Sequence, residues 1–214
     1  VDLEQINKFL NDLYYPLYFL DFETFTQAVP EWDRLRPYQN IPFQYSIHLI
    51  EREGEDPSHL EYLADESSDP RRGLVDRLIR DIPEGACVLA YNKSFEKRVV
   101  RDLAQQFPGY SDHLMDIHNN MLDLMIPFQK KHYYKKEMKG RYSIKAVLPA
   151  LTSDSPYSKM GINEGMEASN NYKNLPSITD LAKREEIKKD LKVYCKQDTQ
   201  SMVDVLGCLK KAVN

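Results

Sequence analysis

The sequence predicts an α/β domain in which helices cover a mixed central sheet. Three observations favour this class. The first third of the chain holds three strand-like segments, and the second of them, residues 43–51, alternates apolar with polar side chains. Helical and strand-like segments then alternate as far as residue 107, and helical patterns dominate the rest. Strands, then alternating elements, then helices are typical of a mixed sheet with helices on its faces.

The predicted elements begin with a helix at residues 2–13, where apolar residues recur at helical spacing. A strand at 17–22 follows, because its apolar and aromatic run comes directly after Pro16. The segments 43–51 and 58–64 are expected to be strands. Turn residues separate them, so they should pair as a hairpin.

The later elements are inferred from the same patterns. They are helix 71–81, strand 86–91, helix 93–107, helix 110–126, a short helix at 143–150 that Ser143 can cap, and one or two helices from Ile178 to about Val213. Two long segments, Thr24–Pro42 and Leu151–Ser177, are expected to be loops. Loops of this length in a compact domain are usually functional or disordered.

Composition places the chain among globular proteins, with one domain over residues 1–214. Of its 214 residues, 42% are hydrophobic and 29% are charged, which suits a single core. The chain starts with Val rather than Met, so we expect a domain excised from a longer protein that has an additional N-terminal domain. No apolar run approaches the roughly 18 residues of a membrane-spanning helix, and no signal-peptide pattern is present. We therefore expect no membrane partner.

The cysteines and the net charge narrow the function classes. Three cysteines, Cys87, Cys195 and Cys208, are too few and too scattered for a disulfide framework or a zinc site. Their scarcity favours a reduced, cytoplasmic setting. The net charge of −4 argues against a protein that coats nucleic acid, but not against an enzyme that holds one strand end.

Two carboxylates stand at the end of the first predicted strand. Asp21 and Glu23 are two residues apart, so a strand would point both to one face of the sheet. Adjacent carboxylates repel each other unless a cation lies between them, and Mg²⁺ takes such oxygen ligands. The pair predicts a metal site for phosphate chemistry. The alternative is two solvated acids at a strand end.

Two further pairs are each separated by four residues. Asn92 and Glu96 lie at the junction between a predicted strand and the next helix, where the alternative is that Asn92 or Ser94 is simply a helix N-cap. Tyr194 and Asp198 fall on one face of the C-terminal helix. For this pair the alternative is a half-buried tyrosine that packs beside a surface aspartate.

In this order, the three motifs resemble those of the DEDDy 3′–5′ exonucleases of the ribonuclease-H-like superfamily, over a span from Tyr18 to about Leu206. The strings RPYQNIPFQYSIH, YNKSFE, RYSIKAVLPAL and NEGMEASNNY are also similar to a bacterial family, domain of unknown function 2779. The resemblance implies a ribonuclease-H-like mixed central sheet flanked by helices. It also implies a metal-dependent exonuclease that hydrolyses phosphodiester bonds at the 3′ ends of single-stranded DNA or RNA.

The resemblance further implies roles for individual residues. Asp21 would bridge two Mg²⁺ or Mn²⁺ ions, and Glu23 and Asp198 would complete the site of the first ion. Tyr194 would orient the attacking water. The backbone around Thr24 would receive the terminal 3′ hydroxyl, which implies exonuclease rather than endonuclease action.

The second motif departs from the usual pattern, because Glu96 stands where these enzymes carry Asp. The extra methylene moves the carboxylate by roughly one C–C bond, and metal geometry is sensitive to ligand position. The resemblance therefore leaves open whether Glu96 supports the second ion directly, through water or not at all. Asp123 is a nearby acid that could assist, although a helical aspartate on a polar face is the favoured interpretation.

A basic segment from Lys130 to Lys145 interleaves lysines with tyrosines, which suits phosphate contacts and base stacking. The expected substrate-binding residues are Thr24, Asn92, Lys135, Lys136, Arg141 and Lys145. The alternative for the segment is a solvated basic loop. For the function, the alternatives are a catalytically weak nucleic-acid-binding module of the same fold and a phosphohydrolase of small nucleotides.

Overall fold

The protein folds around a five-stranded mixed sheet in the computed structural model, which describes residues 1–153 and 156–213. Its strands are β1 (Leu17–Phe25), β2 (Ile41–Ile50), β3 (Ser58–Leu63), β4 (Cys87–Ala90) and β5 (Met121–Asp123). They lie in the order β3-β2-β1-β4-β5. β2 pairs antiparallel with β1 and β3, whereas β4 pairs parallel with β1 and β5. The predicted hairpin is thus confirmed as β2 and β3.

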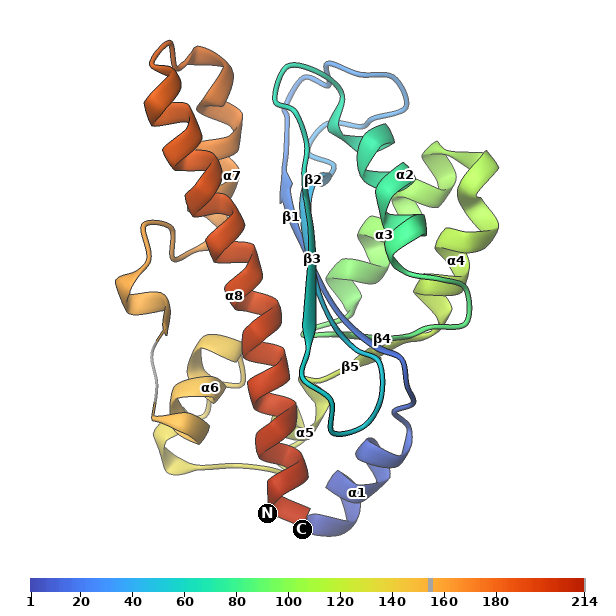
Figure 1. The fold of residues 1–214 in the computed structure, drawn as a ribbon, viewed down its shortest axis with the longest axis vertical. Coiled ribbons are helices and arrows are strands. Elements are labelled where there is room, and N and C mark those ends of the chain that lie inside the picture. Colours follow the sequence, from blue (N-terminus) through green and yellow to red (C-terminus); the bar gives the residue numbers. More distant parts are fainter. Residues whose placement is uncertain (154–155, 214) are drawn as a thin grey trace.

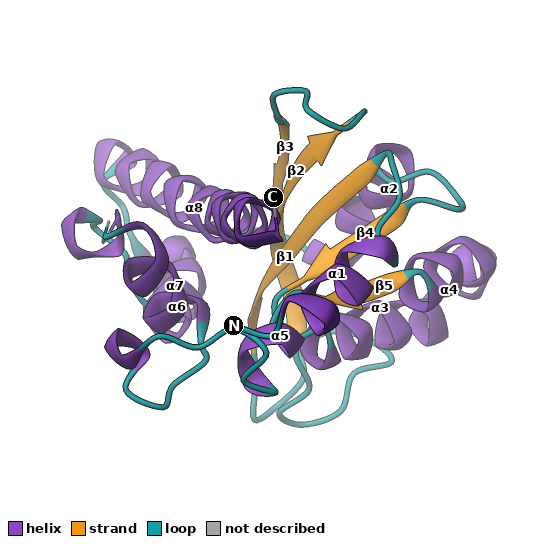
Figure 2. Ribbon diagram, turned by 90° about the horizontal axis from the view of Figure 1, so that it is seen from below, coloured by secondary structure: helices purple, strands orange, loops and turns teal. Residues whose placement is uncertain are grey.

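Helices cover both faces of the sheet. One face is covered by α8 (Leu181–Val213) with α6 (Ile144–Thr152) and α7 (Gly165–Asn174), and the other by α2 (Pro70–Asp81), α3 (Ser94–Gln106) and α4 (Ser111–Asn119) (Figure 1; Figure 2). The shorter segments are α1 (Leu3–Asn11), α5 (Ile126–Gln129) and the 3-10 helices η1 (Pro108–Tyr110), η2 (Lys136–Met138), η3 (Pro156–Lys159) and η4 (Leu175–Ser177). This arrangement confirms the predicted α/β class. No described helix combines the length and the apolar character needed to cross a membrane.

Alternation along β1 divides the interior into two cores. Phe19 packs in the core on the α8 face, whereas Leu20 packs in the core formed with α2, α3 and α4. Side chains two apart on a strand share a face, so Asp21 and Glu23 continue the row of Phe19. The two acids therefore face α8.

One predicted helix is partly wrong. The helix expected at 110–126 ends at Asn119, and Met121–Asp123 forms β5 by pairing with β4. A strand of three residues leaves no periodicity in the sequence, and pairing with its neighbour selects it.

The loop expected at Leu151–Ser177 is wrong in part, because α7 lies within it. Its serine and asparagine residues lower the helix propensity, but Ala168 and Tyr172 are buried against the core on the α8 face. Packing therefore overrides propensity there. The C-terminal run forms one helix of 33 residues, α8, rather than two.

Candidate active site

Asp21, Glu23 and Asp198 lie close together on the α8 side of the sheet, and Glu96 approaches them from α3. Asp21 and Glu23 project from β1, Asp198 from α8, and Glu96 from the first turn of α3. Burial raises the pKa of Asp21 well above its ordinary value, and the nearby charges of Asp198, Glu23 and Glu96 raise it further. Three separate stretches of the chain thus supply one acidic cluster.

A cavity of about 750 Å³ opens beside this cluster. The expected site residues that line it are Asp21, Glu23, Thr24, Asn92, Lys145, Tyr194 and Asp198. Its wall also includes aromatic and apolar side chains, among them Phe95, Tyr142 and Met166. The cavity therefore combines acids, one lysine and surfaces on which a ring can stack.

Most of the basic segment lies outside this cavity. Lys135, Lys136 and Arg141 do not line it, and the last two are exposed. Lys135 is close to Cys208, which lies between two and three turns beyond Asp198 on α8. Of the basic residues expected to bind substrate, only the last one in the segment therefore reaches the described cavity.

Burial and mutual repulsion make the acidic cluster costly to ionise. Burial raises the pKa of Glu23 well above its ordinary value, and Asp198 adds to this rise while Lys145 opposes it. Burial also raises the pKa of Asp198 to about 6. A hydrogen bond from Tyr157, the charge of Lys145 and a hydrogen bond from Tyr194 limit that rise. A bound cation would relieve the cost of ionising both acids.

Glu96 carries a buried carboxylate oxygen without a hydrogen-bond partner in the described part of the chain. Its side chain is 3% exposed, and Oε2 has no hydrogen-bond partner among the described residues. Burial raises its pKa to about 8, with the charge of Asp123 adding to the shift. A buried carboxylate oxygen without a donor is costly. Asp21 and Glu23 bring ligand atoms within 4.8 Å of each other, and carboxylate oxygens are the hard donors that Mg²⁺ or Mn²⁺ takes.

Asp123 fixes the backbone that leads into α3. It is buried at the end of β5 and accepts hydrogen bonds from the backbone N–H groups of Asn92 at 3.0 Å, Lys93 at 3.3 Å and Met125 at 3.0 Å. The interpretation as a helical aspartate on a polar face is therefore wrong. The alternative of a capping Asn92 side chain is also wrong, because Lys93 is the N-cap of α3 and no side chain caps it.

Two tyrosines and a lysine surround Asp198. Tyr194 is buried, and its hydroxyl accepts a hydrogen bond of 3.0 Å from Nζ of Lys145. Tyr157 donates to Oδ1 of Asp198 at 2.7 Å, and its hydroxyl lies 2.9 Å from Oγ of Ser201. Nζ of Lys145 also lies 5.0 Å from the centre of each tyrosine ring. The half-buried tyrosine expected by the alternative is not what the structure contains.

Tyr157 was missed in the sequence, because it falls in a segment expected to be a loop and has no partner nearby in the chain. Its partner Asp198 lies 41 residues away. Only the packing of η3 against α8 brings the two together.

Comparison with known proteins identifies relatives but no activity. A family described as "Domain of unknown function (DUF2779)" matches residues 18–143. The "Uncharacterized protein UU173" of Ureaplasma parvum is 26% identical over 221 residues, covering 92% of this chain and 31% of that protein. The "Uncharacterized protein MG366 homolog" of Mycoplasma pneumoniae is 25% identical over 207 residues, covering 87% of this chain and 31% of that protein. The chain thus spans less than a third of each relative. No solved structure matches it.

Proposed function

The chain belongs to the family described as domain of unknown function (DUF2779), and we propose that it is a metal-dependent 3′–5′ exonuclease acting on single-stranded nucleic acid. The observation that carries the proposal is the meeting of Asp21, Glu23 and Asp198 at one cavity, with a fourth carboxylate, Glu96, near enough to raise the pKa of Asp21. Oε2 of Glu96 has no partner among the described residues. The strand order β3-β2-β1-β4-β5 is compatible with a ribonuclease-H-like sheet. The resemblance of the motifs to DEDDy enzymes supports attack from the 3′ end.

Asp21, Glu23 and Asp198 would hold Mg²⁺ or Mn²⁺, with Glu96 supporting a second ion. Two such ions, when bound, activate a water nucleophile and neutralise charge that develops on the phosphoryl oxygens. The three β1 and α8 carboxylates line the cavity, so a phosphodiester placed there meets them directly.

Tyr194 is the residue that we assign to orienting the attacking water. Its hydroxyl is anchored by the amine of Lys145 at 3.0 Å, and both residues line the cavity. A hydroxyl held by a donor has its lone pairs and its proton fixed in direction, which suits positioning of a small nucleophile. The ammonium of Lys145 also offers a charge for a substrate phosphate.

Thr24 is the residue that we assign to the terminal nucleotide. The register of β1 and β2 shifts between Glu23 and Thr24, and Thr24 stands opposite Pro42. Proline has no N–H group, so it cannot donate a ladder hydrogen bond to this part of β1. The irregular backbone at the cavity wall is therefore suited to receiving a 3′ hydroxyl.

The test is degradation of end-labelled single strands of DNA and RNA in Mn²⁺. A strand blocked at its 5′ end should be degraded to mononucleotides, and one blocked at its 3′ end should resist. Tyr194→Phe should lower turnover by roughly 10–1000-fold with an unchanged melting temperature, because one positioned hydroxyl is lost. Asp198→Asn should be worse, since it removes a ligand and its charge. Equal degradation of both blocked strands, or full turnover in Asp198→Asn, would refute the proposal.

A phosphohydrolase of small nucleotides is the second candidate, because Lys135, Lys136 and Arg141 do not line the cavity. The volume of about 750 Å³ also falls within the roughly 300–1,000 Å³ usual for small-molecule sites. Faster hydrolysis of a mononucleotide ester than of a long strand would favour this candidate. Strand binding without Mn²⁺-dependent release would instead favour a catalytically weak binding module.

A further inference from the structure

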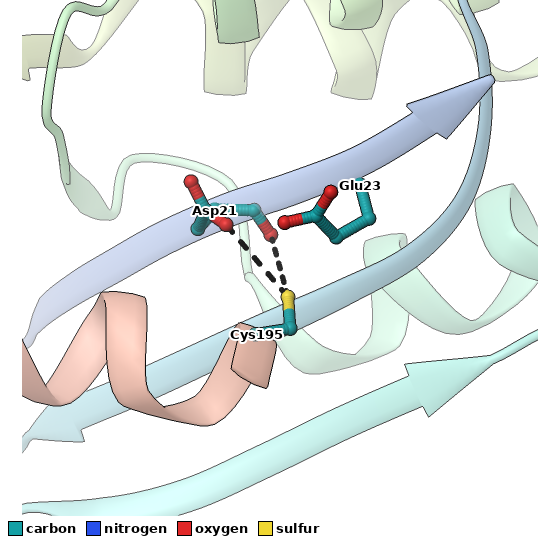
Figure 3. Close-up of side chains that lie close together, drawn as sticks. All are labelled: Asp21, Glu23 and Cys195. Carbon is teal, nitrogen blue, oxygen red and sulfur yellow. Dashed lines mark hydrogen bonds between the residues drawn. The ribbon is translucent and has the colours of Figure 1, made fainter. Parts of the chain in front are cut away.

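A cysteine lies against the acids of the candidate active site. Sγ of Cys195 is 3.7 Å from Oδ2 of Asp21 and 3.9 Å from its carbonyl oxygen (Figure 3). One ligand atom from each of Asp21, Glu23 and Cys195 lies within 4.8 Å of the other two. Cys195 is fully buried on α8, and its thiol faces Asp21 of β1, with the Glu23 carboxylate beside Asp21 (Figure 3). The thiol is therefore part of the cluster rather than a separate core residue.

The spacing matches a tetrahedral zinc site. Zn–S bonds of about 2.3 Å and Zn–O bonds of about 2.0 Å place sulfur and oxygen about 3.5 Å apart, and two oxygens about 3.3 Å apart. The observed Sγ–Oδ2 separation of 3.7 Å differs from this value by about the tolerance expected of metal sites. Glu23 offers a carboxylate oxygen within 4.8 Å of both of these ligand atoms.

A second observation near the thiol concerns the carboxylate of Glu96. Its buried Oε2 has no partner in the described part of the chain, and its charge acts on both Asp21 and Glu23. None of the ion pairs formed by described residues involves these three acids. The thiol therefore adjoins two acids whose ionisation burial disfavours and a bound cation would favour.

We propose that Cys195, Asp21 and Glu23 form a mixed sulfur–oxygen site that captures a thiophilic divalent ion such as Zn²⁺. The S–H bond breaks as the S–Zn bond forms, and the proton leaves to solvent with no change in oxidation state. Thiolate ligands select Zn²⁺ over Mg²⁺ and Mn²⁺, which prefer oxygen. Because the captured ion uses Asp21 and Glu23, it excludes the hard ion and inhibits the enzyme; this last consequence rests on the proposed function.

The test titrates the metal-free protein with Cd²⁺ alone and follows the ultraviolet charge-transfer band of a Cd²⁺–thiolate bond. The wild type should give the band at one equivalent. Cys195→Ser should lose it and bind Cd²⁺ more weakly by more than the roughly 10–100-fold typical of losing an outer-shell partner. Cys208→Ser, a change of a half-buried cysteine on the same helix, should behave as the wild type. An equal band in Cys195→Ser would overturn the inference.

A second variant protects the test against misfolding. Glu23→Gln keeps the thiol and should weaken Cd²⁺ binding at least tenfold, while Mn²⁺ added to the wild type should shift the Cd²⁺ titration to higher concentrations. Unchanged Cd²⁺ affinity in Glu23→Gln, or no competition by Mn²⁺, would overturn the shared site. The readout needs no turnover. A thiolate band without nuclease activity therefore defeats only the proposed function, and Mn²⁺-dependent activity without the band defeats only the sulfur site.

Discussion

Tyr157→Phe isolates one hydrogen bond that positions a candidate metal ligand. The hydroxyl donates to Oδ1 of Asp198 at 2.7 Å, and its ring packs edge-on to that of Tyr194 at 6.4 Å between centres. Phenylalanine keeps the ring contact and removes only the donor. Ser201 is not left without a partner, because Nε2 of Gln197 lies 3.1 Å from its oxygen.

The magnitude follows from that bond. A hydrogen bond to an ionised group contributes about 1.5–3 kcal/mol, which corresponds to roughly 10- to 150-fold in an equilibrium constant. We therefore expect Mn²⁺ affinity, measured by calorimetry, to fall by about that factor. In the wild type, the Tyr157 hydroxyl lowers the pKa of Asp198, which is about 6. In Tyr157→Phe this donor is gone, so the pKa of Asp198 should rise above that value. Since the carboxylate must be ionised to bind metal, the pH midpoint of Mn²⁺ binding should move upward.

Tyr172→Phe is the matched control. Tyr172 is also buried, and its hydroxyl donates at 3.2 Å to the backbone oxygen of Asp65, away from the acidic cluster. Tyr172→Phe should lose about 1 kcal/mol of unfolding free energy, because its bond joins uncharged groups, and Tyr157→Phe about 1.5–3 kcal/mol. Only Tyr157→Phe should change the metal affinity and its pH midpoint. Equal Mn²⁺ affinity and an equal midpoint in the two variants would refute the positioning role.

Two further predictions follow from the same cluster. In metal-free protein, the free energy of unfolding should fall as pH rises from about 5 to 8. Burial raises the pKa of Asp198 from 3.8 to about 6 and that of Glu96 from 4.5 to about 8. The folded state therefore binds more protons than the unfolded state across this window, and its stability decreases as pH rises. Chemical denaturation at each pH measures this free energy, and saturating Mn²⁺ should remove its decrease with pH. An unfolding free energy that rises with pH in the metal-free protein would contradict the reasoning. Lys145→Met should weaken strand binding and lower the slope of log affinity against log salt by about one unit, whereas Lys136→Met, an exposed residue outside the cavity, should leave the slope unchanged. Equal slopes in these two variants, measured by fluorescence anisotropy, would exclude Lys145 from phosphate contact.

Local spacing explains which parts of the site the sequence could predict. Asp21 and Glu23 lie on one strand, and Tyr194 and Asp198 on one helix, so periods of two and of nearly four residues place each pair on one face. The fold class was predictable for the same reason, because most strands and helices carry a local pattern. The two pairs meet because of how α8 crosses β1. In the sequence, only the resemblance of the motifs to a known family indicated this meeting.

Tertiary packing explains what the sequence could not predict. Asp123 supports the backbone before Glu96 from a strand too short to carry a pattern, 31 residues from Asn92. Cys195 reaches Asp21 across 174 residues. Each acts through a contact between distant elements, and no spacing rule in one chain encodes such a contact. The composition of the basic segment is local, but which of its residues reach the cavity depends on the fold: Lys145 lines the cavity, whereas Lys135, Lys136 and Arg141 do not.

The row of β1 side chains that faces α8 contains two acids at positions where apolar residues would stabilise the fold better. Phe19 belongs to the buried core on this face, as does Phe25, and period two would extend the apolar row between them. Asp21 and Glu23 occupy that stretch instead, and burial raises the pKa of both well above the ordinary values. Two apolar residues there would pack against α8 without any cost of ionisation. The apolar alternation of β1 is thus interrupted at two adjacent positions of the row, near a cavity and near the unpaired buried carboxylate of Glu96. Such an interruption is expected of a binding site rather than of a core.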